Sequence, residues 1–176
     1  LEHIESQCEW LERLVQTLLK LITLEREIER RPCEVDALFD TVRQNTQKSL
    51  ADRGVTLITH SGGGTLNCNA DLIQSLLINL VDNAAKAYDT DAPDKRVFLT
   101  FSGDTIEVRD FGRGIPEQAM GRIFEPFYMV DKSRSKKAGG SGLGLALVKR
   151  IADAHDAELT VKSGVGKGTT VRVRFQ

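Results

Sequence analysis

The chain has 176 residues, which is enough for one globular domain and one further element. Hydrophobic residues make up 40% and charged residues 28%, as in ordinary soluble proteins, and a net charge of −1 gives no overall positive field for binding nucleic acid. No apolar run is long enough to cross a bilayer, so we expect no membrane contact here, and any membrane anchor of the parent protein outside this piece. Three scattered cysteines (Cys8, Cys33 and Cys68) lack metal-ligand or disulfide spacing, which indicates a reducing, cytoplasmic compartment.

The first predicted element is an amphipathic helix that ends before Pro32, because the residue before a proline disfavours helical geometry. Its apolar residues alternate in steps of four and three, as in the seam of a coiled coil or helical bundle. One helix cannot bury such a stripe, so we expect a partner helix or a second copy of the chain. The stripe consists of Ile4, Cys8, Leu11, Val15, Leu18 and Ile22, and Leu14 and Leu21 widen it.

Residues 34–53 are predicted to form a second helix, which Gly54 can terminate. Further along the chain, the strand patterns and turn residues predict a sheet. The expected strands are 55–59, 66–68, 96–101, 105–109, 158–162 and 169–175, with glycine-containing turns at 60–64, 102–104 and 164–168.

The central predicted helix spans residues 70–89, and Asn69 or Asp71 can cap its start. Its apolar residues follow helical spacing, whereas Asn79, Asn83 and Lys86 line up along another side. Amide oxygens are suitable ligands for Mg²⁺, and a lysine offers a point charge to phosphate. The alternative is an ordinary polar outer face. The buried stripe is expected to contain Leu72, Ile73, Leu76, Leu77, Leu80, Val81 and Ala84.

A strand that ends in Asp110 runs into Gly112 and Gly114. A carboxylate at this position can accept a hydrogen bond from an exocyclic amine such as that of adenine, and the glycines allow a flat ring to approach the main chain. The alternative is a glycine-rich turn that the aspartate caps.

Residues 129–138 follow an aromatic segment that places Phe124 and Phe127 around Pro126. They are rich in lysine and arginine and have no apolar period, which predicts a mobile loop. The loop is either merely solvated or a lid whose cations close over a polyphosphate. Its cations are Lys132, Arg134, Lys136 and Lys137.

A second glycine-rich loop, residues 139–145, opens an apolar helix. Free backbone N–H groups and the positive end of a helix dipole make such a loop a candidate anion site.

Together, these motifs resemble the catalytic ATP-binding domain of sensor histidine kinases, within the GHKL ATPase group. The resemblance rests on five blocks in order: Asn79/Asn83, Asp110-x-Gly112-x-Gly114, Phe124/Phe127, Gly140-x-Gly142-x-Gly144 and Gly168-Thr169. The N-terminal helix is similar to the second helix of that family's dimerisation and phosphoacceptor domain. The expected domains are therefore residues 1–31, a bundle helix, and residues 32–176, an ATP-binding domain.

The resemblance implies a two-layer α/β sandwich with a mixed sheet that binds ATP and Mg²⁺. Asn83 would be the metal ligand, and Asn79 and Lys86 would support the phosphates. Asp110 would read the adenine amine, and Thr169 would lie nearby. Many family members have an arginine of the lid at the position of Met129, where it meets the γ-phosphate. We therefore assign this role to Arg134 instead. The remaining residues assigned to the ATP site are Gly112, Gly114, Ile115, Phe124, Gly140, Ser141, Gly142, Leu143, Gly144 and Leu145.

The residue at position 79 separates transfer from hydrolysis. ATP-hydrolysing GHKL members carry a glutamate there that activates water, and the amide of Asn79 is not a useful general base. Phosphoryl transfer depends chiefly on positioning and charge neutralisation. We therefore expect transfer of the γ-phosphoryl group to a histidine.

In the family that the chain resembles, the acceptor histidine lies on the first bundle helix and is followed by an acidic residue and, four or five places on, by a proline. None of His3, His60 and His155 fits this pattern. The expected partners are thus ATP or ADP, the parent's acceptor-histidine helix, a response regulator, and a second copy in a full-length homodimer. Two alternatives stay open: a degenerate kinase that binds nucleotide without transfer, and an anti-sigma-factor-type Ser/Thr kinase.

Overall fold

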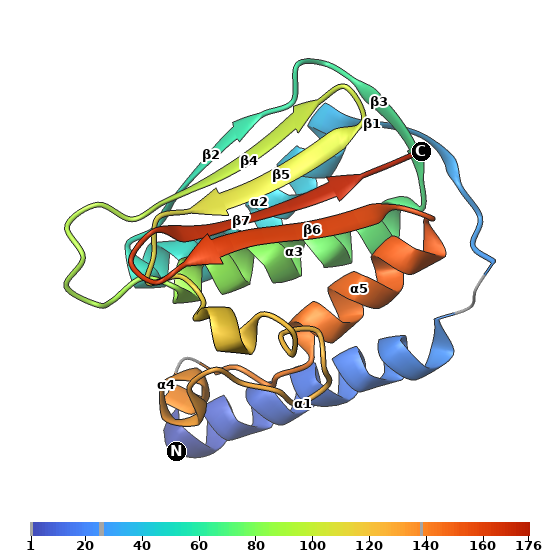
Figure 1. Cartoon of the computed structure of the whole chain (residues 1–176). Coiled ribbons are helices and arrows are strands. Elements are labelled where there is room, and N and C mark those ends of the chain that lie inside the picture. The colour runs from blue at the N-terminus through green and yellow to red at the C-terminus, as the bar shows by residue number, and fades with distance from the viewer. Residues whose placement is uncertain (1, 25–26, 138) are drawn as a thin grey trace.

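A mixed five-stranded sheet, with helices along one of its faces, forms the body of the molecule (Figure 1). The computed structural model describes residues 2–24, 27–137 and 139–176. The sheet order is β2-β4-β5-β7-β6, with β2 and β4 parallel and the other pairs antiparallel. This arrangement confirms the expected two-layer α/β sandwich. The strands are β2 (Thr56–His60), β4 (Arg96–Ser102), β5 (Thr105–Asp110), β6 (Glu158–Gly164) and β7 (Gly168–Arg174).

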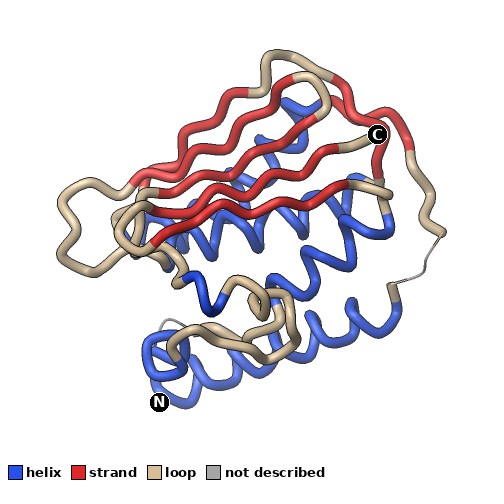
Figure 2. Tube along the Cα trace, viewed as in Figure 1, coloured by secondary structure: helices blue, strands red, loops and turns tan. Residues whose placement is uncertain are grey.

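Three helices pack against the sheet: α2 (Val35–Arg53), α3 (Ala70–Lys86) and α5 (Gly144–Ala154) (Figure 2). Strand periodicity explains the core, because alternate residues of β5 point toward the helices. Ile106 and Val108 are buried in this way, and Asp110 continues the same series. A carboxylate is therefore placed on the core face of the sheet.

The central helix α3 buries the stripe that the sequence predicts. The Oδ1 atom of Asn69 caps the helix by accepting a hydrogen bond from the Leu72 N–H at 3.1 Å. The helix ends at Lys86, three residues earlier than expected, and backbone and side-chain groups of Arg113 bind its last carbonyls. The buried residues are Ile73, Leu76, Leu77, Leu80, Val81, Ala84 and Ala85.

A short strand that the sequence analysis missed precedes α2. The strand β1 (Arg31–Glu34) pairs antiparallel with β3 (Thr65–Cys68) in a separate two-stranded sheet. Pro32 and its charged neighbours conceal the strand, because proline and charge are rare within strands. The pairing brings Cys33 beside Cys68, and both are free cysteines.

The long helix α1 (Glu2–Thr23) has two different faces. The predicted stripe is exposed, with Ile4 at 64% and Ile22 at 70%. Leu14 and Leu21 do not widen this stripe as expected. They face the body instead: Leu21 packs against the core and Leu14 lines the main cavity. No helix of the described residues is long and apolar enough to cross a membrane.

The basic segment that follows the aromatic residues contains a short helix, α4 (Lys132–Lys137). The expectation that residues 129–138 lack regular structure is therefore wrong. Asp131 caps α4, since its Oδ1 accepts the N–H groups of Ser133 at 3.1 Å and Arg134 at 3.2 Å. A short 3₁₀ helix, η1 (Glu117–Ala119), precedes this segment. Ala138 and the side chains of His3 and Lys136 lie outside the described part.

Candidate functional site

One cavity of about 560 Å³ lies between α3, the start of α5, the ends of β5 and β7, the α4 segment and α1. Cavities of this size are typical of small-molecule sites. It brings together most of the residues that the sequence analysis assigned to one site. These are Asn79, Asn83, Lys86, Asp110, Gly114, Ile115, Arg134, Gly140, Ser141, Gly142, Gly144, Leu145 and Thr169.

The buried carboxylate of Asp110, only 4% exposed, lies at the sheet end of the cavity. Burial raises its pKa to about 6, although hydrogen bonds from the backbone of Gly112 and Thr169 and the charge of Arg113 act in the opposite direction. The Gly112 N–H donates to Oδ1 at 2.8 Å. At neutral pH the carboxylate is thus mostly ionised and is a strong acceptor for a ligand donor.

Ser163, which the sequence analysis missed, positions the loops around Asp110. Its Oγ accepts a hydrogen bond from the Ile115 N–H at 2.8 Å and donates to the Gly168 carbonyl at 2.9 Å. The hydroxyl of Thr169 lies 2.8 Å from the same Oγ. Because Ser163 has a single proton, Thr169 donates to it and keeps oxygen lone pairs as acceptors. No local pattern signals this role, since Ser163 lies 48 residues from Ile115.

Two glycines are required by close backbone packing around the cavity. Gly114 has a φ of +73°, and a Cβ atom there would overlap the carbonyl oxygen of Gly164. Gly142 also has a φ of +73°, and its Cβ would lie 2.8 Å from the Cα of Phe127. These two glycine-rich loops therefore pack directly on neighbouring main chain.

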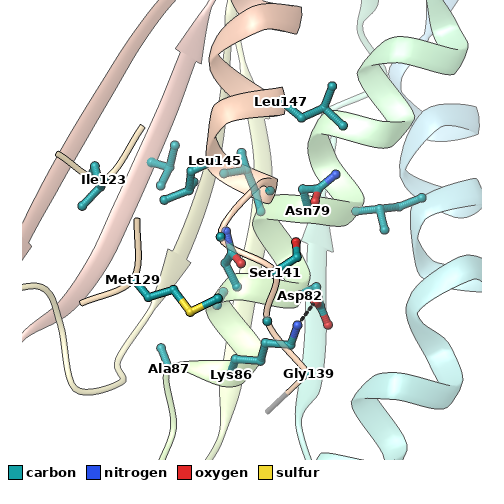
Figure 3. A pocket seen from close by; sticks show the side chains of 18 of the residues that line it. Asn79, Asp82, Lys86, Ala87, Ile123, Met129, Gly139, Ser141, Leu145 and Leu147 are labelled. Atoms are coloured by element: carbon teal, nitrogen blue, oxygen red, sulfur yellow. Dashed lines mark ion pairs between the residues drawn. The ribbon is translucent and has the colours of Figure 1, made fainter. Parts of the chain in front are cut away.

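The polar side of α3 faces the cavity. The Nδ2 group of Asn79 donates to the Ser75 carbonyl at 2.8 Å, and its Oδ1 would lie 2.9 Å from a Cβ on Gly144. Figure 3 shows Asn79, Asp82 and Lys86 beside Ser141 and Gly139 of the second glycine-rich loop. Lys86 forms an ion pair of 2.6 Å with Asp82, a residue that the sequence analysis did not single out.

The donor set on this side of α3 fits a magnesium ion that also binds polyphosphate. Asn83 lines the cavity and is exposed, so its amide oxygen is available. Mg²⁺ usually takes one or two protein oxygens and completes its shell with phosphate and water. Among the described residues no group of three histidines, cysteines or carboxylates could hold a metal by itself, so the ligand would have to supply the remaining oxygens.

Arg134, the expected lid cation, lines the cavity and forms an ion pair of 2.9 Å with Asp89. Nearby, the structure departs from one expectation. Phe124 lies outside the cavity, whereas its neighbour Ile123, 6% exposed, lines it together with Met129. The bulky aromatic residue suggested a ligand contact, but the aliphatic one provides the surface.

Two other assigned residues also lie behind the cavity rather than along it. Leu143, within the glycine-rich loop, is fully buried, and its N–H donates to the Oγ of Ser141 at 3.4 Å. Gly112 is buried and contacts the carboxylate of Asp110 through its N–H. Each supports a residue that lines the cavity.

The helix α1 forms one wall of the cavity, which the sequence analysis did not predict. Trp10, Arg13, Thr17 and Lys20 all line the cavity. Nothing local signals this, because the helix meets residues more than a hundred positions away, such as Gly140.

A buried carboxylate at a strand end, an amide-bearing helix and a glycine-rich loop that opens a second helix surround one cavity in a two-layer sandwich. This combination defines the ATP-binding domains of the GHKL class. Residues 68–176 match the family of histidine kinase-, DNA gyrase B-, and HSP90-like ATPases, and the chain belongs to this family.

The chain is similar to sensor proteins of bacteria. It is 35% identical to the sensor histidine kinase YkoH of Bacillus subtilis, over 99% of this chain and 38% of that protein. It is 33% identical to the phosphate regulon sensor protein PhoR of Pseudomonas aeruginosa, over 99% of this chain and 41% of that protein. The chain thus spans about two fifths of the length of these relatives.

Solved structures share its fold. The full-length ShkA structure, in complex with AMPPNP, superposes with a TM-score of 0.78 at 24% identity, over 94% of this chain and 35% of that one. The histidine kinase AdeS of Acinetobacter baumannii gives a TM-score of 0.76 at 20% identity, over 99% of this chain and 83% of that one.

Proposed function

We propose that this chain is the ATP-binding catalytic portion of a cytoplasmic two-component sensor histidine kinase. It transfers the γ-phosphoryl group of Mg-ATP to a histidine outside this chain, from which the group passes to a response regulator. One observation carries the proposal: a single cavity joins the buried acceptor Asp110 at one end to the amides and cations of α3 at the other.

The Asp110 end of the cavity suits adenine. The ionised carboxylate accepts a hydrogen bond from the exocyclic amine, and the Thr169 hydroxyl presents a second acceptor beside it. Guanine carries a carbonyl oxygen where adenine carries the amine, so its oxygen would face the carboxylate unfavourably. Gly114 and Ile115 provide the surface against which the ring packs.

The α3 end suits a metal-bound polyphosphate. Asn83 is the protein ligand that we assign to Mg²⁺, with Asn79 and Lys86 near the phosphates and metal-bound water. When bound, the ion neutralises phosphate charge and orients the terminal group. The backbone N–H groups of the loop at Gly140 and Gly142 lie at the start of α5, where anions bind favourably.

Transfer is favoured over hydrolysis because the described part of the cavity lacks a free carboxylate near Asn79. Three carboxylates line the cavity. Asp110 lies at the adenine end, Asp82 is paired with Lys86, and Asp131 caps α4. Without a general base, water is a poor nucleophile, whereas an imidazole can attack without one.

The two histidines whose side chains the structure describes support an external acceptor. His155 is 2% exposed and uses both ring nitrogens in hydrogen bonds, so it is inaccessible to a phosphoryl group. His60 is exposed at the end of β2 and does not line the cavity. The acceptor helix of the parent protein has a suitable docking surface in the exposed stripe of α1, which also suits pairing with a second copy.

One observation favours a runner-up function, nucleotide binding without transfer. Lys86 and Arg134 are both held in ion pairs with carboxylates, so a phosphate would have to displace Asp82 or Asp89 to reach them. A degenerate kinase that acts as a nucleotide-dependent scaffold would need no free cation.

Calorimetry and labelling test the proposal. We expect the chain to bind ADP and AMPPNP more tightly with Mg²⁺ than without it, to hydrolyse ATP very slowly and not to label itself. Adding a fragment that bears the acceptor helix should restore labelling as an acid-labile, base-stable phosphohistidine. Binding without labelling would favour the scaffold, and rapid hydrolysis that Asn79→Ala abolishes would contradict the assignment.

A further inference from the structure

The helix α1 closes one side of the nucleotide cavity instead of standing apart from the body. In the first half of the helix, the indole N–H of Trp10 donates to the Gly140 carbonyl at 3.4 Å. Near its end, the ammonium group of Lys20 donates to the Ser75 hydroxyl of α3 at 3.0 Å. Figure 1 shows α1 running beneath α5 and the α4 segment. Its inner face therefore spans from the glycine-rich loop to the polar side of α3.

This placement brings Arg13 to the phosphate end of the cavity. Arg13 lies seven residues before Lys20, about 10 Å along the helix. Its Nη2 atom lies 3.9 Å from where a Cβ on Gly139 would be. Gly139 and Ser141 lie beside Asp82 and Lys86 in Figure 3. The guanidinium group thus lies beside the loop that we assign to phosphate binding.

The other cations that line the described part of the cavity are already engaged. Lys86 and Arg134 are paired with Asp82 and Asp89. Arg113 donates to the carbonyls at the end of α3, and Lys20 donates to Ser75.

Arg13 differs from these cations. Within the described ranges it has no carboxylate partner, and its hydrogen bond goes from Nε to the Glu9 carbonyl of its own helix at 3.3 Å. The two terminal amino groups of its guanidinium, which form a planar fork, remain available to a ligand. Arginine is suited to this task, because its planar group matches two phosphate oxygens at once.

We propose that Arg13 binds the terminal phosphate of the nucleotide, so that α1 adds a cation to a cavity in which Lys86 of α3 and Arg134 of the α4 segment are both paired with carboxylates. The inference rests on the proposed nucleotide-binding function. It has a thermodynamic consequence: a nucleotide that contacts both α1 and the body favours the docked position of α1, and docking favours the nucleotide equally.

Calorimetry with AMP, ADP and AMPPNP at one Mg²⁺ concentration tests the role of Arg13. For Arg13→Gln we expect about tenfold weaker AMPPNP binding, a smaller loss for ADP and no change for AMP, because only the longer nucleotides reach α1. Arg13→Lys should fall between Arg13→Gln and the unaltered chain, since it keeps the charge but not the fork. Arg43→Gln is the matched control, an exposed arginine on α2 that does not line the cavity.

Trp10 provides a second measurement, because it is the only tryptophan of the chain. Its emission should change when AMPPNP binds, and the change should shrink in Arg13→Gln. If the unaltered chain binds none of the three nucleotides, the proposed function fails and the inference falls with it. If it binds them, but Arg13→Gln keeps the same ratio of AMPPNP to AMP affinity, the inference alone is overturned.

Discussion

The two ends of the cavity are built by different physical means. At the sheet end, Asp110 is buried and held by backbone hydrogen bonds, and Ser163 ties Thr169 to the neighbouring loops. At the α3 end, Lys86 and Arg134 lie in ion pairs, and the Lys86–Asp82 side chains are 19% and 32% exposed. The side chains of Arg134 and Asp89 are 54% and 52% exposed.

This difference separates recognition that is part of the core from recognition that can rearrange. A buried ionised carboxylate lowers the stability of the fold whether or not a ligand is present. Exposed ion pairs contribute little, typically about 0 to 1 kcal/mol each, so they can exchange partners when an anion arrives. We therefore expect base recognition to be rigid and phosphate recognition to be adjustable.

The sharpest way to test this contrast is Asp110→Asn. We expect nucleotide affinity to fall on the order of 100-fold, because a charge-assisted hydrogen bond is lost. The same change should raise the free energy of unfolding by about 1 to 2 kcal/mol at pH 7.5, since it removes a desolvated charge. Calorimetry and urea unfolding measure the two effects.

The pH dependence of the free energy of unfolding tests whether the Asp110 carboxylate destabilises the fold. Its raised pKa of about 6 means that the folded state holds a proton that the unfolded state releases near pH 4. The stability from this group therefore falls as pH rises from about 4 to 6, and the advantage of Asp110→Asn should vanish near pH 4. Asp104→Asn, in the exposed turn between β4 and β5, is the control. An advantage that persists at pH 4 would contradict the burial argument.

At the α3 end of the cavity, we expect Asn83→Ala to cause a smaller loss of nucleotide affinity. AMPPNP affinity in the presence of Mg²⁺ should fall about tenfold, since a metal-ligand amide is lost. Affinity without Mg²⁺ and thermal stability should hardly change, because Asn83 is exposed. Gln74→Ala, on the same helix but outside the cavity, is the control. Equal losses with and without the metal would remove Asn83 from the metal site.

His155 offers a pH test outside the cavity. Its Nε2 accepts the Asn69 N–H at 3.1 Å, and its Nδ1 lies 2.8 Å from the Ile151 carbonyl, to which it donates. Burial lowers its pKa, so below about pH 6.5 the unfolded state binds a proton that the folded state resists. Stability from this group should therefore fall as pH drops below 6.5.

The comparison of His155→Gln with the unaltered chain isolates this effect, because Asp110 acts with the opposite sign in the same range. Urea unfolding between pH 5 and 7.5 should show that the difference between the two proteins narrows toward low pH. A constant difference across this range would show that His155 does not titrate with folding.

The smallest expected effect concerns the lid ion pair. Arg134→Gln should change the free energy of unfolding by less than about 0.5 kcal/mol, because both partners are half exposed. Thermal unfolding at low and high salt measures this. A loss above about 1 kcal/mol would mean that the lid segment is anchored as firmly as the core.

Local patterns predicted the parts of the site that lie within single elements. Helical spacing located the polar face of α3, and the strand before Asp110 placed its carboxylate at a strand end. The helix α4 has a capping residue, Asp131, but it lacks an apolar period, and a cap alone does not predict a helix.

What the sequence did not reveal depends on distant contacts. Ser163 bridges two loops, Arg113 binds the end of α3, and Trp10 reaches Gly140 across 130 positions. The choice of Ile123 over Phe124 depends on how the chain turns after η1. Such contacts follow from the assembled fold, because no spacing rule connects the residues that make them.

The missed strand β1 gives the molecule a mechanical connection. It begins soon after α1, and its partner β3 ends at Cys68, directly before the Asn69 that caps α3. Tension applied through residues 27–30 is therefore carried across the β1–β3 ladder to the start of α3. A pull on this segment thus reaches the amide-bearing helix through the backbone pairing of two short strands.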